Sequence, residues 1–439
     1  MIFSLPNNVL KIIESLNRNN YECFVVGGCV RDMLLGNPPK DYDLTTNAKP
    51  NEILEVFKDY KTFDAGIKHG TISVVIDNEV FEITTYRIDG DYLDSRHPEN
   101  VVFTDAIEKD LSRRDFTVNA MAYSPQTGLV DYYGGVDDIK YKAIRCVGEP
   151  DIRFREDALR ILRALRFASV YNFSIEFNTY NAIMNNKNLL NNISKERISS
   201  ELTKIICGES CDYILRRFKE VFAVVIPEIS SMFHFEQNNP HHNKTLWKHT
   251  VSSVKNIDND EVLRMTMLLH DIGKPLAEKM DKKGVSHYNG HEKISSTMAE
   301  RILKRLRYSN SFINQVVLLI KYHDVGISTD KFSIKKMLNI MGKENFSLLL
   351  KVRYADIMAQ SYYQLEEKLS EYNQVKELFN EIISNKECYQ ISDLAVNGKT
   401  LLENGITDGK EIGEKLNYLL NLVMSEECKN TEEELLKFI

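Results

Sequence analysis

The chain lacks most of the features that mark a secreted or membrane protein. Only seven cysteines are scattered through 439 residues, and their odd number does not suggest a disulfide framework. No basic start leads into an apolar run, and nowhere is there an uncharged apolar stretch of the roughly 18 residues that a membrane span needs. We therefore expect a cytoplasmic protein without a membrane segment.

The chain also has no excess of positive charge. Its 56 Lys and Arg residues face 63 Asp and Glu residues, and the formal net charge is −7. This balance argues against indiscriminate binding to nucleic acid, although it leaves room for a local basic groove that faces one polyanion. Internal repeats and low-complexity tracts are missing as well. The composition is that of a globular protein long enough for about two to four domains.

The sequence pattern changes from mixed to helical after about 150 residues. Short β-rich runs at Cys23–Val26, Thr71–Ile76 and Val80–Thr85 are broken by glycine pairs and helical stretches. From Arg155 onward, apolar residues recur at spacings of three and four, as in helices with one buried face. A polar stretch containing Pro240 then marks a boundary. The predicted domains are a head (1–147), a neck and body (148–240), a histidine-containing helical domain (241–362) and a helical tail (363–439).

The densest motif, VVGGCVRDMLLGNPPKDYDLTT, contains two aspartates that are suited to metal binding. Asp41 and Asp43 are two apart, so on a strand both carboxylates point to the same face and can share Mg²⁺. Two such ions activate an attacking hydroxyl and stabilise the leaving pyrophosphate. Glu82 is a candidate third carboxylate. A solvated strand edge is the plainer explanation of the aspartates, but the neighbouring glycines and arginine favour the metal site.

Two further features of this region suit a nucleoside triphosphate. A strand ends at two glycines, the second of which is Gly28, and such a turn lets backbone N–H groups approach a phosphate closely. Arg31 follows one helical turn later and can add a charge-assisted bond. Farther along, Arg113 and Arg114 form a pair in which at least one guanidinium can hold phosphate.

The stretch EDALRILRALRFA predicts a helix with a polar face. Asp157 and Arg160 are three apart, and Arg163 and Arg166 prolong the face. Cytosine and adenine each present an amino donor beside a ring-nitrogen acceptor, so an aspartate with an arginine complements both, whereas uracil and guanine have the reverse polarity. Unpaired buried groups would reject the wrong base. An ion-paired amphipathic helix is the alternative for this segment taken alone.

Three motifs in order, GGCVRDMLLG with DYD, RRDFTVNAMAY and EDALRILRALRFA, resemble the class II tRNA nucleotidyltransferases, the bacterial CCA-adding enzymes. The match covers residues 20 to about 210. It implies an α+β protein with a five-stranded polymerase-β-like head followed by all-α neck, body and tail. It also assigns base selection to Asp157 and Arg160, with Arg163 and Arg166 near the nucleotide, and it relates the stretch from Arg87 to Arg113 to the loop needed for the final A.

The segments TLWKHT, LLHDIGKP, YNGHEK, KYHD and RYADIMAQ resemble the HD phosphohydrolase superfamily. This resemblance assigns four metal ligands and two residues that could complete a two-metal version. The four are His249, His270, Asp271 and Asp356, and the two are His291 and His323. Such ligands suit a transition metal that activates water for phosphoester hydrolysis. Structural histidines are the alternative, and we assign His241 and His242 to the linker.

The sequence therefore predicts addition of C, C and A to the 3′ end of tRNA from CTP and ATP. The expected cofactor is Mg²⁺, with a second divalent metal in the HD domain, and no obligatory protein partner is evident. A poly(A) polymerase shares the head and neck and is the nearest alternative, together with an enzyme that adds only C residues or only A. A hydrolase whose head senses nucleotides is a further alternative.

Overall fold

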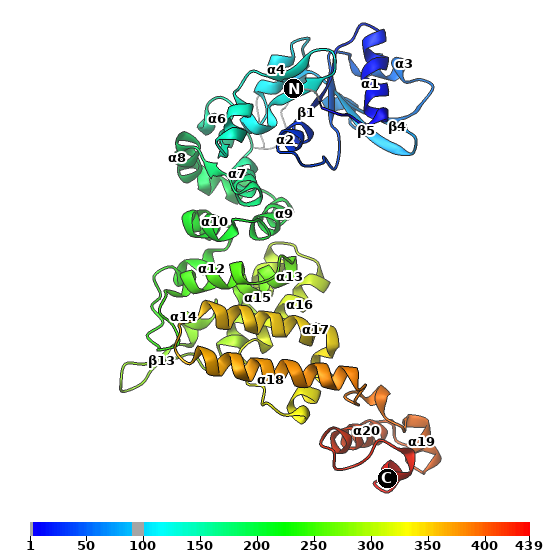
Figure 1. Ribbon diagram of the computed structural model, residues 1–439, viewed down its shortest axis with the longest axis vertical. Helices are drawn as coiled ribbons and strands as arrows, with labels where there is room; N and C mark the ends of the chain where they lie inside the picture. Colours follow the sequence, from blue (N-terminus) through cyan, green and yellow to red (C-terminus); the bar gives the residue numbers. More distant parts are fainter. Residues whose placement is uncertain (1–2, 90–100) are drawn as a thin grey trace. The chain divides into compact units, whose positions relative to one another are not determined.

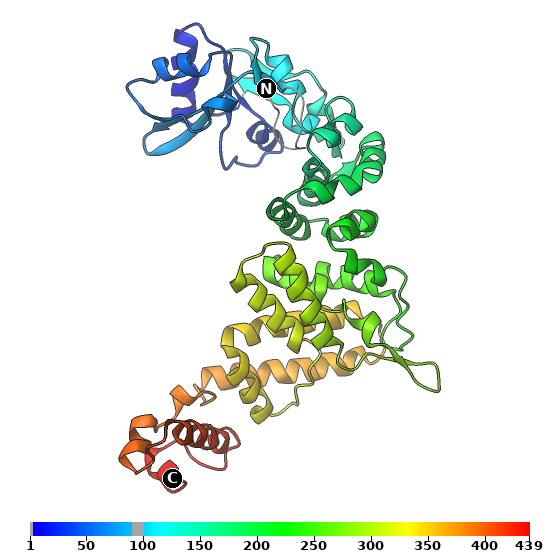
Figure 2. The same cartoon turned by 180° about the vertical axis from the view of Figure 1, so that it is seen from behind.

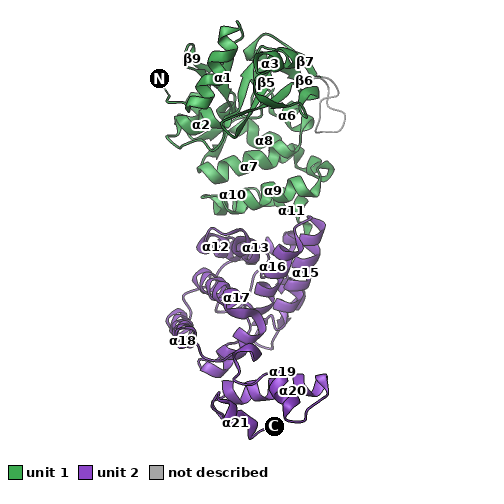
Figure 3. Cartoon of the chain, turned by 90° about the vertical axis from the view of Figure 1, so that its right-hand side faces the viewer, with its two compact units in different colours: residues 1–227 green, residues 228–439 purple. Residues whose placement is uncertain are grey.

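The computed structural model describes residues 3–89 and 101–439, shown from opposite sides in Figures 1 and 2. The chain divides into two compact units, Met1–Pro227 and Glu228–Ile439 (Figure 3). The predicted boundary after residue 240 lies within the second unit, and the division into four domains stays a prediction. The stretch from Arg87 to Arg113, related above to the loop for the final A, lies partly outside the described residues.

The head is built on a seven-stranded sheet of order β3-β4-β5-β2-β1-β8-β9, in which β2 and β5 run parallel and the other neighbours antiparallel. The resemblance implies five strands, whereas the sheet of this structure has seven. The strands are β1 (Cys23–Val26), β2 (Leu44–Thr46), β3 (Lys61–Phe63), β4 (Thr71–Ile76), β5 (Glu79–Thr85), β8 (Met121–Ser124) and β9 (Gly128–Asp131).

Both faces of this sheet are covered, which explains why every residue of β1 is buried. Side chains alternate along a strand, so Cys23 and Val25 join the core under helix α1 (Asn7–Arg18), whereas Phe24 and Val26 pack with Leu111 of α4 (Ile107–Ser112). Helix α1 buries residues at helical spacing, and it lies next to α3 (Pro50–Val56) in Figure 1. The head is thus an α+β layer structure, as predicted.

The helices that follow show one clear departure from the predicted pattern. The segment expected to form one helix is broken at Asp157, whose φ of −143° and ψ of 103° are extended. Helix α6 (Pro150–Glu156) ends before it, and α7 (Leu159–Tyr171) begins after it. Asp157 and Arg160 therefore do not share a helix face. The remaining helices of this unit are α2 (Gly28–Leu34), α5 (Gly135–Lys140), α8 (Phe177–Asn186), α9 (Lys195–Ile206), α10 (Cys211–Arg217) and α11 (Lys219–Val225).

The second unit is helical, as predicted, apart from the short hairpin of β12 (Lys279–Met280) and β13 (Ser286–His287). Its longest element, α17 (Lys331–Ala359), is interrupted at Gly342 and runs beside α18 (Leu365–Ser384), as both Figures 1 and 2 show. The other helices are α12 (Leu246–Asn256), α13 (Glu261–Leu269), α14 (Lys274–Ala277), α15 (His291–Arg305), α16 (Asn310–Tyr322), α19 (Gly398–Glu403), α20 (Gly409–Met424) and α21 (Glu432–Leu436).

Smaller elements complete the structure. Strand β6 (Arg87–Asp89) pairs with β7 (Val101–Phe103), and β10 (Ala143–Ile144) with β11 (Ser174–Ile175). All seven cysteines are free, and Cys211 is buried whereas Cys207 is partly exposed. Among the helices in the described ranges, none is both long and apolar enough to cross a bilayer.

Candidate functional site

The carboxylates of the predicted metal site lie just before the start of β2, not within it. Asp41 and Asp43 precede Leu44, the first residue of the strand. The Asp43 carbonyl nevertheless accepts a hydrogen bond of 3.0 Å from Val26 N–H, which continues the pairing of β2 with β1. The parallel register pairs Leu44 with Ile83 on β5, so one step earlier along both strands Asp43 comes beside Glu82. The fold thereby gathers carboxylates that the sequence separates widely.

The electrostatics of Asp43 show that these carboxylates influence one another. Although the residue is exposed, neighbouring protein atoms partly desolvate its carboxyl group and raise its pKa, and the negative charges of Asp41 and Glu82 add to the rise while Arg114 opposes it. A cation would relieve this repulsion, and carboxylate oxygens are the ligands that Mg²⁺ prefers. The donor set therefore fits the predicted metal.

The glycine turn is shaped around Arg114. Gly27 precedes α2 with a φ of 79°, and a Cβ at this position would lie 2.9 Å from Nη1 of Arg114. Only glycine allows this backbone conformation and this approach together. Arg114 Nη2 lies 3.5 Å from Oδ2 of the fully buried Asp110. Asp110 also accepts hydrogen bonds of 2.9 and 3.0 Å from Arg113. The sequence analysis missed Asp110, which local spacing from both arginines could have revealed.

Arg31 joins the head to the neck. Its Nη1 donates to Asn119 Oδ1 at 2.6 Å, and its Nε and Nη2 donate to Asp32 Oδ1. The guanidinium also lies 4.5 Å from the ring centroid of Tyr171 on α7. Because only 6% of the residue is exposed, its position is fixed by these contacts. The predicted phosphate ligand is therefore also a structural link.

Asp157 and Arg160 lie near one another but bind different partners. Asp157 Oδ2 accepts a bond of 2.7 Å from Arg197 Nη2, and its Oδ1 caps α7 by accepting from Leu159 N–H. Arg160 Nη1 donates to Glu156 Oε2 at 2.6 Å. Glu156 stands four residues before Arg160, so sequence spacing could have shown this pair, whereas Arg197 comes from α9 and gave no local signal.

The last two neck arginines are each paired with a buried acid. Arg163 Nη2 lies 2.5 Å from Asp115 Oδ2, and Arg166 Nη1 lies 2.9 Å from Glu201 Oε1. Burial alone would raise the pKa of Asp115, but the charge of Arg163 and the hydrogen bond from Asn119 outweigh it and lower the pKa to about 2. Asp115 is thus a charged link between the arginine pair of the head and the neck helix.

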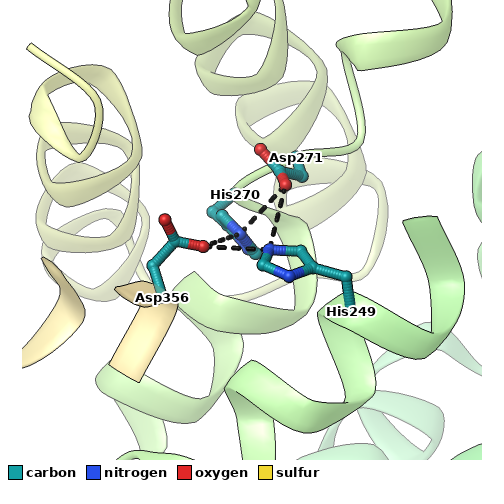
Figure 4. Close-up of side chains that lie close together, drawn as sticks. All are labelled: His249, His270, Asp271 and Asp356. Atoms are coloured by element: carbon teal, nitrogen blue, oxygen red, sulfur yellow. Dashed lines mark hydrogen bonds and ion pairs between the residues drawn. The ribbon is translucent and has the colours of Figure 1, made fainter. Parts of the chain in front are cut away.

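In the second unit, the four predicted HD ligands converge (Figure 4). His249 comes from α12, His270 and Asp271 follow α13, and Asp356 belongs to α17. His249 Nε2 lies 2.9 Å from Asp356 Oδ1, and His270 Nε2 lies 3.2 Å from Asp271 Oδ2. One donor atom of each residue falls within 4.8 Å of all the others. The fold therefore brings together residues that span more than a hundred positions.

A second group of potential ligands shares Asp271. His291 Nε2 and His323 Nε2 lie 3.2 and 3.6 Å from Asp271 Oδ1, whereas His249 and His270 approach its other oxygen, Oδ2. His291 Nε2 and His323 Nε2 are 3.3 Å apart. Asp271 thus has one carboxylate oxygen directed to each histidine pair, which is the arrangement of a carboxylate that bridges two cations.

Backbone carbonyls orient three of these histidines so that Nε2 is available to a metal. The Nδ1 atoms of His270, His291 and His323 each lie 2.7–2.9 Å from a backbone carbonyl, so an Nδ1–H donor leaves the Nε2 lone pair free. Gln360 Nε2 similarly donates to Asp356 Oδ2 at 2.8 Å. His270 Nε2 and Asp271 Oδ1 are buried without a hydrogen-bond partner, whereas Asp271 Oδ2 lies 2.8 Å from Lys274 Nζ. An unpartnered imidazole nitrogen beside an unpartnered carboxylate oxygen fits a bound cation.

A cavity of about 380 Å³ opens beside this cluster. The cationic side chains of Lys274, Arg353 and Lys368 line it, together with four of the candidate metal ligands: Asp271, His291, His323 and Asp356. His241 and His242, assigned to the linker in the sequence analysis, also line it, and the ring of His242 lies 5.1 Å from that of His249. The linker assignment is therefore wrong, because the polar stretch folds back against α12. Positive charge beside the ligands suits a phosphorylated substrate.

Comparison with known families places the first unit in an established class. Residues 23–145 match the Poly A polymerase head domain, and residues 172–233 match the family described as "Probable RNA and SrmB-binding site of polymerase A". Residues 291–439 match the tRNA nucleotidyltransferase domain 2 family. Together with the carboxylates just before β2 and the arginines of the head, these matches define a nucleotidyltransferase that acts on tRNA.

Curated relatives give the family. The chain is 32% identical to the CCA-adding enzyme of Enterococcus faecalis over 99% of this chain and 96% of that one, and 31% identical to that of Pediococcus pentosaceus over 95% and 93%. The CCA-adding enzyme of Geobacillus thermodenitrificans is 49% identical, but the alignment spans only 45% of this chain and 49% of that one. The chain belongs to the CCA-adding enzyme family, which confirms the resemblance inferred from its motifs.

Solved structures agree with this assignment. The CCA-adding enzyme of Bacillus stearothermophilus in complex with CTP matches 99% of this chain and 97% of its own, with 27% identity and a TM-score of 0.75. The Thermotoga maritima CCA-adding enzyme complexed with tRNA_CCA has the same fold, with 21% identity and a TM-score of 0.62. The predicted α+β fold with a helical body is thereby confirmed.

Proposed function

We propose that this enzyme completes the 3′ end of tRNA by adding C, C and A from CTP and ATP and releasing pyrophosphate. One observation carries the proposal: contacts through Arg31, Asn119, Asp115 and Arg163 join α2, the helix after the glycine turn, to α7. Val26, directly before that turn, donates its N–H to the carbonyl of Asp43. A carboxylate site for metal and a cationic site for phosphate therefore belong to one structure. Family membership points to the same reaction.

In the proposed mechanism, Asp41 and Asp43 hold Mg²⁺, and Glu82 adds negative charge beside them. Bound there, Mg²⁺ would supply Lewis-acid chemistry for the attacking 3′ hydroxyl of tRNA and for the leaving pyrophosphate. Gly28 offers its backbone N–H to the triphosphate, and Arg31 and Arg114 neutralise its charge. The triphosphate is thus positioned by residues of the head.

The incoming base is selected by the neck without a nucleic-acid template. Asp157 accepts a hydrogen bond from the amino group of cytosine or adenine, and Arg160 donates to the ring nitrogen. Both side chains exchange their present partners, Arg197 and Glu156, for the base. Arg163 and Arg166 lie nearby and hold the nucleotide. Uracil and guanine would leave buried groups unpaired.

The decisive experiment uses purified protein, Mg²⁺ and tRNA that lacks its 3′ end. Labelled CTP, ATP or both are supplied, and products are resolved at single-nucleotide resolution. Three ordered additions followed by arrest are expected. A long A ladder would make the chain a poly(A) polymerase, and addition of only C or only A would indicate that another enzyme shares the pathway.

A second activity is supported by the histidine cluster. We infer that His249, His270, Asp271 and Asp356 bind a divalent transition metal, that His291 and His323 complete a second site, and that the cavity hydrolyses a phosphoester. The convergence of these ligand atoms in two groups that share Asp271, each group within 4.8 Å, carries this inference. Metal analysis of wild type and Asp271→Asn is the test, since the variant should lose bound metal. Equal metal content, or no Mn²⁺-stimulated release of phosphate from simple phosphoesters by the wild type, would exclude the hydrolase.

A further inference from the structure

The buried aromatic ring of Phe167 lies among three of the arginines expected to hold the nucleotide. The guanidinium carbons of Arg31, Arg163 and Arg166 lie 5.2, 5.4 and 4.3 Å from its centroid. Only 6% of Phe167 is exposed. An aromatic face attracts cations through its quadrupole, most strongly where water is excluded. The three arginines come from two elements, α2 and α7, that are far apart in the sequence.

Tyr171, one helical turn after Phe167, extends this aromatic surface. The two rings are stacked with centroids 6.2 Å apart and an interplanar angle of 23°. Arg31 lies over the ring of Tyr171, and the Tyr171 hydroxyl donates a hydrogen bond of 3.1 Å to Asp32 Oδ1. That same oxygen accepts from Arg31. Arg31 is therefore held between an aromatic face of the neck and an acidic side chain of its own helix.

Close packing of three guanidinium groups is costly unless their charge is balanced. Asp115 balances Arg163 and Glu201 balances Arg166, while Arg31 is bonded to Asp32 and Asn119. The acids pair with single arginines, whereas the Phe167 ring contacts all three. An aliphatic side chain of similar volume would fill the space but would leave the cations without this common attraction.

We propose that Phe167 and Tyr171 are positioning residues that set the spacing between the triphosphate-binding Arg31 of the head and the nucleotide-binding arginines of the neck. This inference rests on the proposed function of these arginines. Asp157 and Arg160 have other partners, so base selection should not depend on the aromatic pair. The two rings should therefore govern nucleotide affinity for CTP and ATP alike.

The test compares Phe167→Leu with Phe222→Leu, a matched loss of a buried phenylalanine on α11 of the same unit. Phe167→Leu should raise KM for both CTP and ATP by about tenfold, with a smaller change in kcat, as expected for loss of a buried cation–π contact. Phe222→Leu should leave both KM values unchanged. Discrimination against UTP and GTP should be the same in the wild type and in both variants.

Fluorinated phenylalanine at position 167 separates electrostatics from packing and covers the case in which Phe167→Leu does not fold. Fluorine weakens the negative face of the ring while almost preserving its shape, so KM should rise as fluorines are added. KM values that stay constant through the fluorinated series would overturn the inference. That outcome would leave CCA addition by the wild type intact, whereas failure of the wild type to extend tRNA would refute the proposed function itself.

Discussion

At the scale of single residues, Asp41 and Asp43 combine opposing effects on stability and activity. Partial desolvation, together with the negative charge of Asp41, raises the pKa of Asp43, so the pair disfavours the folded apoprotein while favouring a bound cation. Such a conflict is typical of functional sites. Asp271 differs: burial alone would raise its pKa, but the charges of His270 and Lys274 outweigh burial and lower the pKa, so its surroundings stabilise the carboxylate.

Asp41→Ala should reduce nucleotide transfer by at least about a hundredfold, because it removes a ligand of the reacting metal. The melting temperature should be unchanged or slightly higher, since a repulsive charge is lost. Single-turnover extension of tRNA lacking its 3′ end and thermal unfolding are the measurements. Asp59→Ala, an exposed acid after α3, is the control. Full activity of Asp41→Ala in the presence of Mg²⁺ would contradict the assignment.

Asp115→Asn should destabilise the first unit by about 2 kcal/mol at pH 7, the value that corresponds to a pKa lowered from 3.8 to about 2 in the folded state. A carboxyl group whose pKa is lower in the folded state stabilises the fold at pH values above its unfolded-state pKa. This contribution is lost as the pH falls from about 4 toward 2. The difference between wild type and variant should therefore shrink below pH 4. Urea unfolding at several pH values tests this. Asp137→Asn, an exposed change, should have little effect at any pH.

At the scale of elements, the contact between α7 and the end of α9 depends on a single small residue. A Cβ on Gly208 would lie 2.7 Å from the Cβ and the carbonyl carbon of Ser169 on α7. The close approach also places Ser210 N–H within 2.9 Å of the Ser169 carbonyl. Because α7 carries the arginines proposed to bind the nucleotide, this contact fixes the helix that would support the site.

Gly208→Ala should therefore destabilise the first unit by about 1–3 kcal/mol through overpacking. Combining it with Ser169→Ala should not restore stability, because the clash includes atoms that alanine retains. Denaturant unfolding provides the measurement. Gly413→Ala in α20, where nothing lies within 4 Å of the added Cβ, should be neutral or slightly stabilising. Equal stabilities for the two variants would show that α7 and α9 can separate at little cost.

At the scale of the whole molecule, the two compact units each carry one set of chemical groups. The nucleotide site is built from residues before Pro227 and the histidine cluster from residues after Glu228. His270→Ala should therefore lose metal from the second unit and keep tRNA extension, whereas Asp41→Ala should keep the bound transition metal. Metal analysis and the extension assay on both variants are sufficient. Loss of tRNA extension in His270→Ala would show that the units depend on one another.

How much the sequence could predict depended on the distance over which residues interact. The strands Cys23–Val26 and Thr71–Ile76 were predicted with the bounds that the structure has, because local composition specifies them. The helix through Asp157 was predicted wrongly as continuous, since apolar periodicity alone does not reveal that Asp157 caps α7 and binds Arg197. His241 and His242 were likewise misplaced, because a polar linker pattern carries no information about the cavity that it folds against.

The sequence by itself determined the chemistry: which carboxylates, glycines, arginines and histidines are present, and their spacing along each segment. Only the tertiary structure decided that Asp43 lies beside Glu82, that Asp271 faces two pairs of histidines, and that Phe167 and Tyr171 hold Arg31 against the neck. The reason is physical. Spacing along a chain fixes neighbours only within a strand or a few helical turns, whereas contacts between distant segments depend on how buried faces pack together.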